Sequence, residues 1–383
     1  MSSTRRCTVA ALAVLSVAAP ARAQVRIKSK AEEITLTGRF QLQARTTSCS
    51  TFPVDPGSAC AGQESGLDWF VRRARLTAEV KINDFIDGKI QPDFGEVDGV
   101  ELKDAWGRLT FSPGAKLKIG HFKRPFDGFQ MTSSTKILTI ERDLDVPGVS
   151  GLTAASYDEF TTKFGLSDRD LGLMLSGETT DGRFEYWIGT FNGGDAKSNG
   201  DGNTEKQLIG RGQVALDAGG HPLALAAAVA LTDAPFTRAT GERDAEYYTN
   251  VELWAELGDF KGGPHVQAGF VLGDNPRQNP LGGPIDLDAG EDFASMYAWQ
   301  GIGSYRIQLE GDGPVEAIEP LLRVTRAEPN TDLDDDEVWG FTPGVQIFFT
   351  GRNKLAFNWD FVTFADPTRD SENSFKAQYQ FHF

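Results

Sequence analysis

Six arginines of this chain lie on the polar side of segments in which apolar and polar residues alternate. In residues 68–81, Arg73 and Arg75 fall on one side and Leu76 on the other, because successive side chains of a strand point to opposite faces. A planar guanidinium forms forked hydrogen bonds with phosphate and other oxyanions, so a row of these side chains could hold an anion weakly and pass it along. The six are Arg39, Arg73, Arg75, Arg211, Arg306 and Arg323.

The same arginines allow a second interpretation. Each could pair with an acidic side chain on a facing segment and keep the structure ordered without binding a solute. The candidate partners are Glu79, Glu252, Glu256, Glu319 and Asp360. The residues alone leave both interpretations open.

The elements that must position these residues are short strands. From Ile34 onward the chain contains about sixteen segments of strand character, and none of comparable length shows a 3.6-residue period. The last segment places Phe375, Tyr379 and Phe381 on one face and Lys376 on the other. The predicted segments are 34–46, 68–81, 88–95, 100–112, 115–124, 168–179, 183–192, 206–217, 222–233, 245–257, 264–273, 293–309, 314–327, 336–350, 353–365 and 374–383.

Short and long connections alternate between these segments. The connections at 180–182 and 311–313 are tight and glycine-containing, whereas those at 47–66, 125–167 and 234–244 are long and polar. Sorting of this kind is typical of an up-and-down barrel with tight turns at one rim and long loops at the other.

The apolar faces of the segments indicate a membrane protein. After the first 25 residues no apolar run approaches the roughly 20 residues that a spanning helix needs, and a closed barrel is the other structure that satisfies every backbone group in lipid. The polar faces carry too many charges for a packed core, and about sixteen strands leave an aqueous channel. We therefore expect an all-β, transmembrane, antiparallel up-and-down barrel with short periplasmic turns and long extracellular loops.

The N-terminus has the pattern of an export signal. Arg5 and Arg6 precede an apolar stretch, and the small residues around Ala23 form a cleavage site. We expect a signal peptide at 1–23 cleaved after Ala23, a short periplasmic segment at 24–33 and one barrel domain at 34–383.

Export and charge limit the partners. In an oxidising compartment Cys49 and Cys60, which lie in one long connection, are candidates for a disulfide, and with no histidine nearby they are poor metal ligands. A formal net charge of −16 excludes nucleic acid as a natural partner. We expect no metal and no cofactor.

One stretch carries motifs of a known family. It contains W-F-V-R-R-A-R-L at 69–76, P-D-F-G at 92–95, L-K-D-A-W at 102–106, I-G-H-F-K-R-P-F at 119–126 and I-E-R-D at 140–143. In order and spacing these motifs resemble the phosphate-selective porin O and P family of bacterial outer membranes. The dense arginine ladder and lysine cluster of the family's phosphate-selective members cannot be traced fully in this chain.

The resemblance implies a sixteen-stranded barrel, commonly a homotrimer, with one loop folded into the pore. The connection at 125–167 is the natural candidate for that loop. It follows Lys123 and Arg124 and contains Lys136 and Arg142, so these four join the six strand arginines as candidate pore-lining and anion-binding residues.

The expected function is passive diffusion of small hydrophilic solutes across the outer membrane, with a preference for anions such as phosphate. The alternatives are a general, non-anion-selective porin and a non-conducting structural or adhesin barrel. The expected partners are outer-membrane lipid and small anionic or polar solutes. An enzyme is disfavoured because no histidine lies near a Gly-x-Ser-x-Gly turn. The four histidines are His121, His221, His265 and His382.

Overall fold

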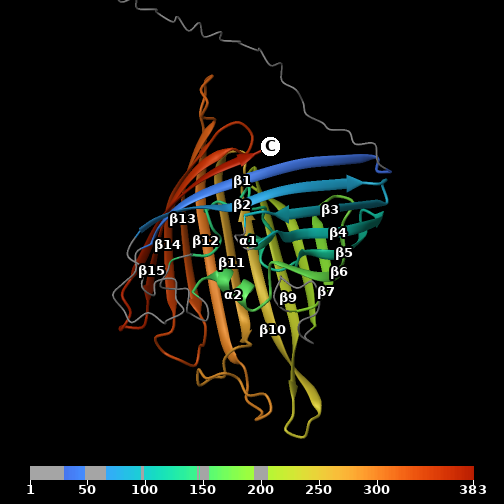
Figure 1. Cartoon of the computed structure of the whole chain (residues 1–383), viewed down its shortest axis with the longest axis vertical. Helices are drawn as coiled ribbons and strands as arrows, with labels where there is room; N and C mark the ends of the chain where they lie inside the picture. The colour runs from blue at the N-terminus through green and yellow to red at the C-terminus, as the bar shows by residue number, and fades with distance from the viewer. Residues whose placement is uncertain (1–29, 48–65, 96–98, 145, 147–154, 194–205) are drawn as a thin grey trace, which may run out of the picture.

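The computed structural model describes residues 30–47, 66–95, 99–144, 146, 155–193 and 206–383. Within them, sixteen strands form one closed antiparallel sheet in which every strand pairs with its sequence neighbours and β1 pairs with β16 (Figure 1). This confirms the predicted up-and-down barrel. The expected signal peptide at 1–23 and the cysteines Cys49 and Cys60 lie outside the described residues.

The strands have bounds close to those predicted. They are β1 (Glu33–Thr47), β2 (Gly66–Lys81), β3 (Ile86–Asp93), β4 (Glu101–Ser112), β5 (Ala115–Lys123), β6 (Arg169–Glu178), β7 (Phe184–Phe191), β8 (Gln207–Ala218), β9 (His221–Thr237), β10 (Arg243–Leu257), β11 (Gly263–Asn275), β12 (Ala294–Gln308), β13 (Ala317–Glu328), β14 (Val338–Phe348), β15 (Lys354–Phe364) and β16 (Glu372–His382). Two short helices, α1 (Gly128–Met131) and α2 (Tyr157–Lys163), lie in the connection between β5 and β6. In the part of the chain that the structure describes, no helix has the length and hydropathy needed to cross a membrane.

The barrel closes between its first and last strands. Phe40 lies opposite Phe381 and Leu42 opposite Tyr379, so the aromatic face of β16 continues the apolar face of β1. At the very end, Phe383 exchanges two backbone hydrogen bonds of 3.0 Å with Gly38. The final residue is therefore part of the seam.

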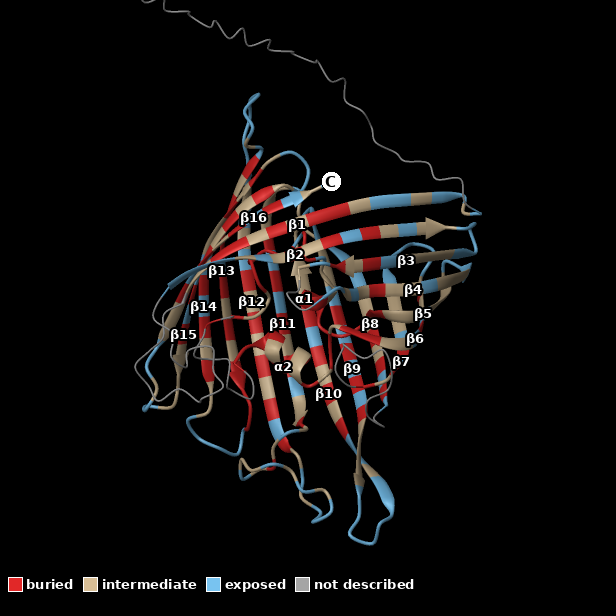
Figure 2. Cartoon of the chain, viewed as in Figure 1, coloured by how far each residue is buried: buried red, intermediate tan, exposed pale blue. Residues whose placement is uncertain are grey.

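The wall has one apolar and one polar face, and Figure 2 shows the alternation of exposed and buried residues along its strands. On β16, Phe375, Tyr379 and Phe381 are exposed, whereas the alternating Lys376 and Gln380 are fully buried. The same alternation runs through the other strands. Because the sheet is closed, the exposed apolar side chains form its outside and the polar ones its inside, as lipid requires.

One predicted loop is shorter than expected. Residues 234–244 were expected to form a long polar connection, but β9 and β10 stay paired through Arg243 opposite Thr237, which leaves only 238–242 between them. The two strands remain paired through their backbones here, although the segment does not have an alternating apolar face. Because the prediction relied on that alternation, it placed a loop at these residues. In Figure 1 this hairpin projects from the barrel at the long-loop end.

Candidate pore and its lining

The connection between β5 and β6, residues 124–168, is here named the inner loop. Its first anchor is Glu252 of β10, whose carboxylate is fully buried. This carboxylate accepts hydrogen bonds of 2.8 Å from the backbone N–H groups of Asp127 and Gly128. It also forms an ion pair of 2.6 Å with Arg211 of β8. Glu252 is inward-facing, because it alternates with the exposed Leu253.

A second anchor holds the middle of the inner loop. Arg323 of β13 donates to the backbone carbonyls of Glu141, Arg142 and Asp143 at 2.7–3.1 Å and to the Asp360 carboxylate at 2.8 Å. Lys376 of β16 binds the same Asp360. Arg323 therefore satisfies loop carbonyls rather than facing open solvent.

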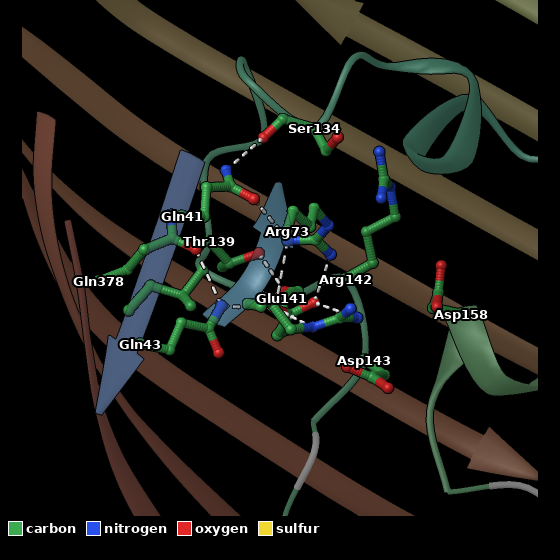
Figure 3. Close-up of polar contacts among 12 residues, drawn as sticks. Gln41, Gln43, Arg73, Ser134, Thr139, Glu141, Arg142, Asp143, Asp158 and Gln378 are labelled. Atoms are coloured by element: carbon green, nitrogen blue, oxygen red, sulfur yellow. Dashed lines mark hydrogen bonds and ion pairs between the residues drawn. The ribbon is translucent and has the colours of Figure 1, made fainter. Parts of the chain in front are cut away.

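Glu141 ties the inner loop to β1 and β2 (Figure 3). Its carboxylate accepts from Arg72 at 2.9 Å, from Arg73 at 2.8 Å and from Gln43 at 2.6 Å. Burial opposes ionisation, but the charges of Arg72 and Arg73 outweigh it and hold the pKa of Glu141 well below its usual range. Glu141 is thus a carboxylate surrounded by cations.

Apolar side chains of the inner loop pack on one sector of the wall. Phe129 and Tyr157 are buried, and the Phe129 ring meets Trp254 edge-on with centroids 4.4 Å apart. Inward-facing Ala228 and Ala230 of β9 belong to the same apolar cluster. Small residues on β9 leave room for the loop, so this sector resembles the core of a globular protein.

Three cavities lie along the β1–β7 sector of the wall, and residues of the inner loop line two of them, the outer and the central cavity. The outer cavity, of about 110 Å³, is nearest the long loops and has seven basic and four acidic side chains. The central cavity, of about 300 Å³, follows it, and the two share Lys123, Ser134 and Arg169. The turn-side cavity, of about 490 Å³, contains Arg108 and shares Trp106 with the central one. The cavities follow one another along β4: Lys103 lines the outer cavity, Trp106 the central one and Arg108 the turn-side one.

The central cavity has a surplus of positive charge. Its only acidic lining residue, Asp104, binds Arg169 at 2.8 Å and Lys89 at 3.0 Å. Arg39 is 9% exposed, and within the described residues it forms neither a hydrogen bond nor an ion pair. The ammonium of Lys118 meets no described carboxylate and lies over the Trp106 ring, 4.7 Å from its centroid.

The turn-side cavity has the opposite balance. Glu33, Glu79, Asp84 and Asp87 line it, against the two basic residues Lys81 and Arg108. Asp87 and Arg108 form a two-point ion pair with distances of 2.7 and 2.9 Å. The sign of the lining charge therefore changes along the barrel. Among the described residues, no group of three or more His, Cys, Asp or Glu side chains could hold a metal ion.

Six of the ten predicted residues line the outer or central cavity. They are Arg39, Arg73, Arg75, Lys123, Arg124 and Arg142. All of these except Arg39 also have structural contacts. Three form ion pairs, Arg73 with Glu141, Arg75 with Asp93 and Arg124 with Asp170. Lys123 and Arg142 donate to the carbonyl of Thr132 in the inner loop.

The other four predicted residues do not line these three cavities. Arg211 and Arg323 face inward as expected, but the buried carboxylates of Glu252 and Asp360 and the loop carbonyls engage them. Arg306 stacks on the Phe348 ring, 3.7 Å from its centroid, and Lys136 lies over Phe260 at 5.5 Å. Strand alternation gives the face of a residue, whereas its depth and its partner depend on the inner loop.

Sequence reasoning missed five basic residues that line the outer or the central cavity. They are Arg72, Lys89, Lys103, Lys118 and Arg169. Lys89 and Lys118 could have been found from strand alternation, since both lie on the polar face of their segments. Arg169 follows the inner loop directly, and only the fold shows that Asp104 of β4 orients it.

A closed antiparallel barrel with an apolar outside and a charged interior is the architecture of outer-membrane porins. The sequence agrees with this class: the family model described as phosphate-selective porin O and P matches residues 55–245, which confirms the resemblance to that family. No curated protein matches the chain in sequence.

Solved porin structures share the fold at low sequence identity. Pseudomonas putida OprB in its high-pH structure has a TM-score of 0.63 and 11% identity, with 92% of this chain and 94% of that chain covered. The anion-selective porin from Comamonas acidovorans has a TM-score of 0.54 and 14% identity, with 92% of this chain and 99% of that chain covered. The trimer form of OmpT, an outer membrane protein of Vibrio cholerae, has a TM-score of 0.54 and 12% identity, with the same two coverages.

Proposed function

We propose that this porin passes small hydrophilic solutes with a preference for anions, and that the inner loop forms its constriction. The observation that carries the preference is the pair Arg39 and Lys118, two cations of the central cavity without a described carboxylate partner. Uncompensated positive charge on a narrow, low-dielectric path raises the local concentration of anions and repels cations.

The loop contacts support the constriction. The inner loop is bound to inward-facing side chains of β10, β13 and β16 through Glu252, Arg323 and Lys376. Solutes would then pass through the three cavities beside β1–β7. Narrowing brings the basic side chains within reach of each permeating ion, where selectivity arises.

Strict phosphate selectivity is not part of the proposal. Most cations of the outer cavity are already engaged, as in the ion pairs of Arg73 with Glu141 and of Arg75 with Asp93. A general porin is the second candidate, and the acidic turn-side cavity favours it.

Export and assembly complete the proposal. We propose cleavage of the signal peptide after Ala23, a disulfide between Cys49 and Cys60, and a homotrimer in the outer membrane. Resemblance to the porin family supports the trimer, and the similar Vibrio cholerae protein is described in a trimer form.

The test is the reversal potential of the purified porin in a planar bilayer under a potassium chloride gradient. We expect chloride to be more permeant than potassium, and the double variant R39Q/K118Q to lower that ratio about twofold or more. The matched control R306Q removes a basic residue outside the three cavities and should leave the ratio unchanged. A wild-type porin that prefers potassium would refute the proposal.

A further inference from the structure

One side of the central cavity is apolar. Trp187 of β7 and Met174 of β6 line it together with Trp106 and Phe122. Trp106 and Trp187 are only partly buried, and both pack at the edge of the apolar cluster beneath the inner loop. A conduit for inorganic ions gains nothing from indole surface facing water, because such surface is more stable when covered.

The other side of the same cavity carries an unused anion-binding group. Arg39 is more than nine-tenths buried and its Nε atom has no described hydrogen-bond acceptor. A buried polar donor without a partner costs free energy, and an oxyanion bound by a guanidinium through forked hydrogen bonds removes that cost.

Lys118 joins the two sides. Its ammonium group lies 4.7 Å from the Trp106 ring centroid and 5.3 Å from that of Phe122. Positive charge and aromatic surface therefore adjoin within one space of about 300 Å³. This volume is at the lower limit of small-molecule pockets and suits a ligand with a single ring.

We propose that the central cavity binds small aromatic carboxylates, with the carboxylate at Arg39 and Lys118 and the ring against Trp187 and Met174. The proposal rests on the proposed anion preference and names the class of anion that this cavity fits best. Inorganic phosphate would use the cations and leave the apolar side in water, so it fits the cavity less well.

The test uses the full porin and four probes: benzoate, acetate, inorganic phosphate and benzyl alcohol. Binding is measured as block of the chloride current in bilayers and, independently of conduction, as a change in tryptophan fluorescence of the protein in detergent. We expect benzoate to bind about tenfold more tightly than acetate, since covering one ring face is worth roughly that factor. Phosphate and benzyl alcohol should both bind more weakly than benzoate.

Two variants assign the binding to the two sides of the cavity. W187A should reduce the benzoate-to-acetate affinity ratio from about tenfold to near one, and W187F should retain most of it. R39Q should weaken benzoate and acetate together, whereas R306Q, outside the cavity, should change neither. Rescue by the conservative W187F separates ring contact from a folding defect.

The outcomes separate the two proposals. Equal binding of benzoate and acetate, or tighter binding of phosphate, overturns this inference while an anion-preferring reversal potential keeps the proposed function. Benzoate binding by fluorescence in a porin that prefers potassium would support the cavity and refute the anion preference.

Discussion

Arg73 of β2 and Glu141 of the inner loop form a buried ion pair of 2.8 Å that connects the barrel wall to this loop. Arg72 and Gln43 bind the same carboxylate, so one acidic group pairs with two arginines beside the outer cavity. Removal of this group should affect both the position of the loop and the charge of the passage.

We expect E141Q to raise the chloride-to-potassium permeability ratio and to lower the thermal stability of the barrel in detergent. Two arginines lose their carboxylate, and breaking a buried pair costs about 3–5 kcal/mol. Reversal potentials and thermal unfolding measure the two effects. E310Q, in an exposed turn, is the control for each, and an unchanged permeability ratio in E141Q would show that these arginines do not face the ions.

Asp127 should make the stability of the inner loop depend on pH. Burial and the nearby charge of Glu252 raise the pKa of Asp127 from 3.8 to about 7, against the opposing effects of Thr161 and Arg142. A raised carboxyl pKa means that the folded state favours the protonated form. The contribution to stability is therefore full below pH 4 and is lost as the pH rises through 7.

The variant D127N keeps a hydrogen-bonding oxygen for the capped N–H groups of Phe129 and Gln130 and removes the titration. We expect the difference in thermal midpoint, D127N minus wild type, to be larger at pH 8 than at pH 4. Asp158 and Tyr157 face the same space, and burial and Asp127 also raise the pKa of Asp158. If the thermal midpoints of D127N and the wild type changed with pH in the same way, Asp127 would be excluded as the titrating group.

Asp360 should be a stability residue rather than a conduction residue. It binds both Arg323 and Lys376, each 1% exposed in its side chain. We expect D360N to destabilise the barrel by about 3–5 kcal/mol because two buried cations lose their carboxylate. The double variant D360N/R323Q should recover part of this loss, and a strictly additive double variant would contradict the pairing.

Gly120 should tolerate no side chain. Its φ is 132°, and an added Cβ would lie 2.3 Å from the backbone oxygen of Ala105 on β4. We expect G120A to lower the thermal midpoint, by an amount that corresponds to about 1–3 kcal/mol. Gly210 of β8 has open space around it, so G210A is the matched control. Equal midpoints for G120A and G210A would disprove the steric argument.

The barrel could be predicted because each strand carries its own signal. Alternation in 374–383 predicted β16 nearly residue for residue, and the same parity placed Arg39, Arg73 and Arg75 on the inside. Parity repeats every two residues and contains no information on depth or on partners.

The site could be predicted only in part for that reason. Arg211 and Arg323 have the same strand pattern as Arg39, yet Glu252, Asp360 and the loop carbonyls engage them, whereas Arg39 is left without a described partner. The difference is made by where the inner loop lies against the wall. Those contacts join residues far apart in the sequence, such as Arg73 with Glu141 and Gly128 with Glu252, and no local pattern specifies them.

The reversal of lining charge between the central and turn-side cavities gives the conduit a direction. A cationic zone in series with an anionic zone is a bipolar junction: one voltage polarity fills it with mobile ions and the other depletes it. The current through a single inserted molecule should therefore rectify. The preferred direction would report which way the molecule faces.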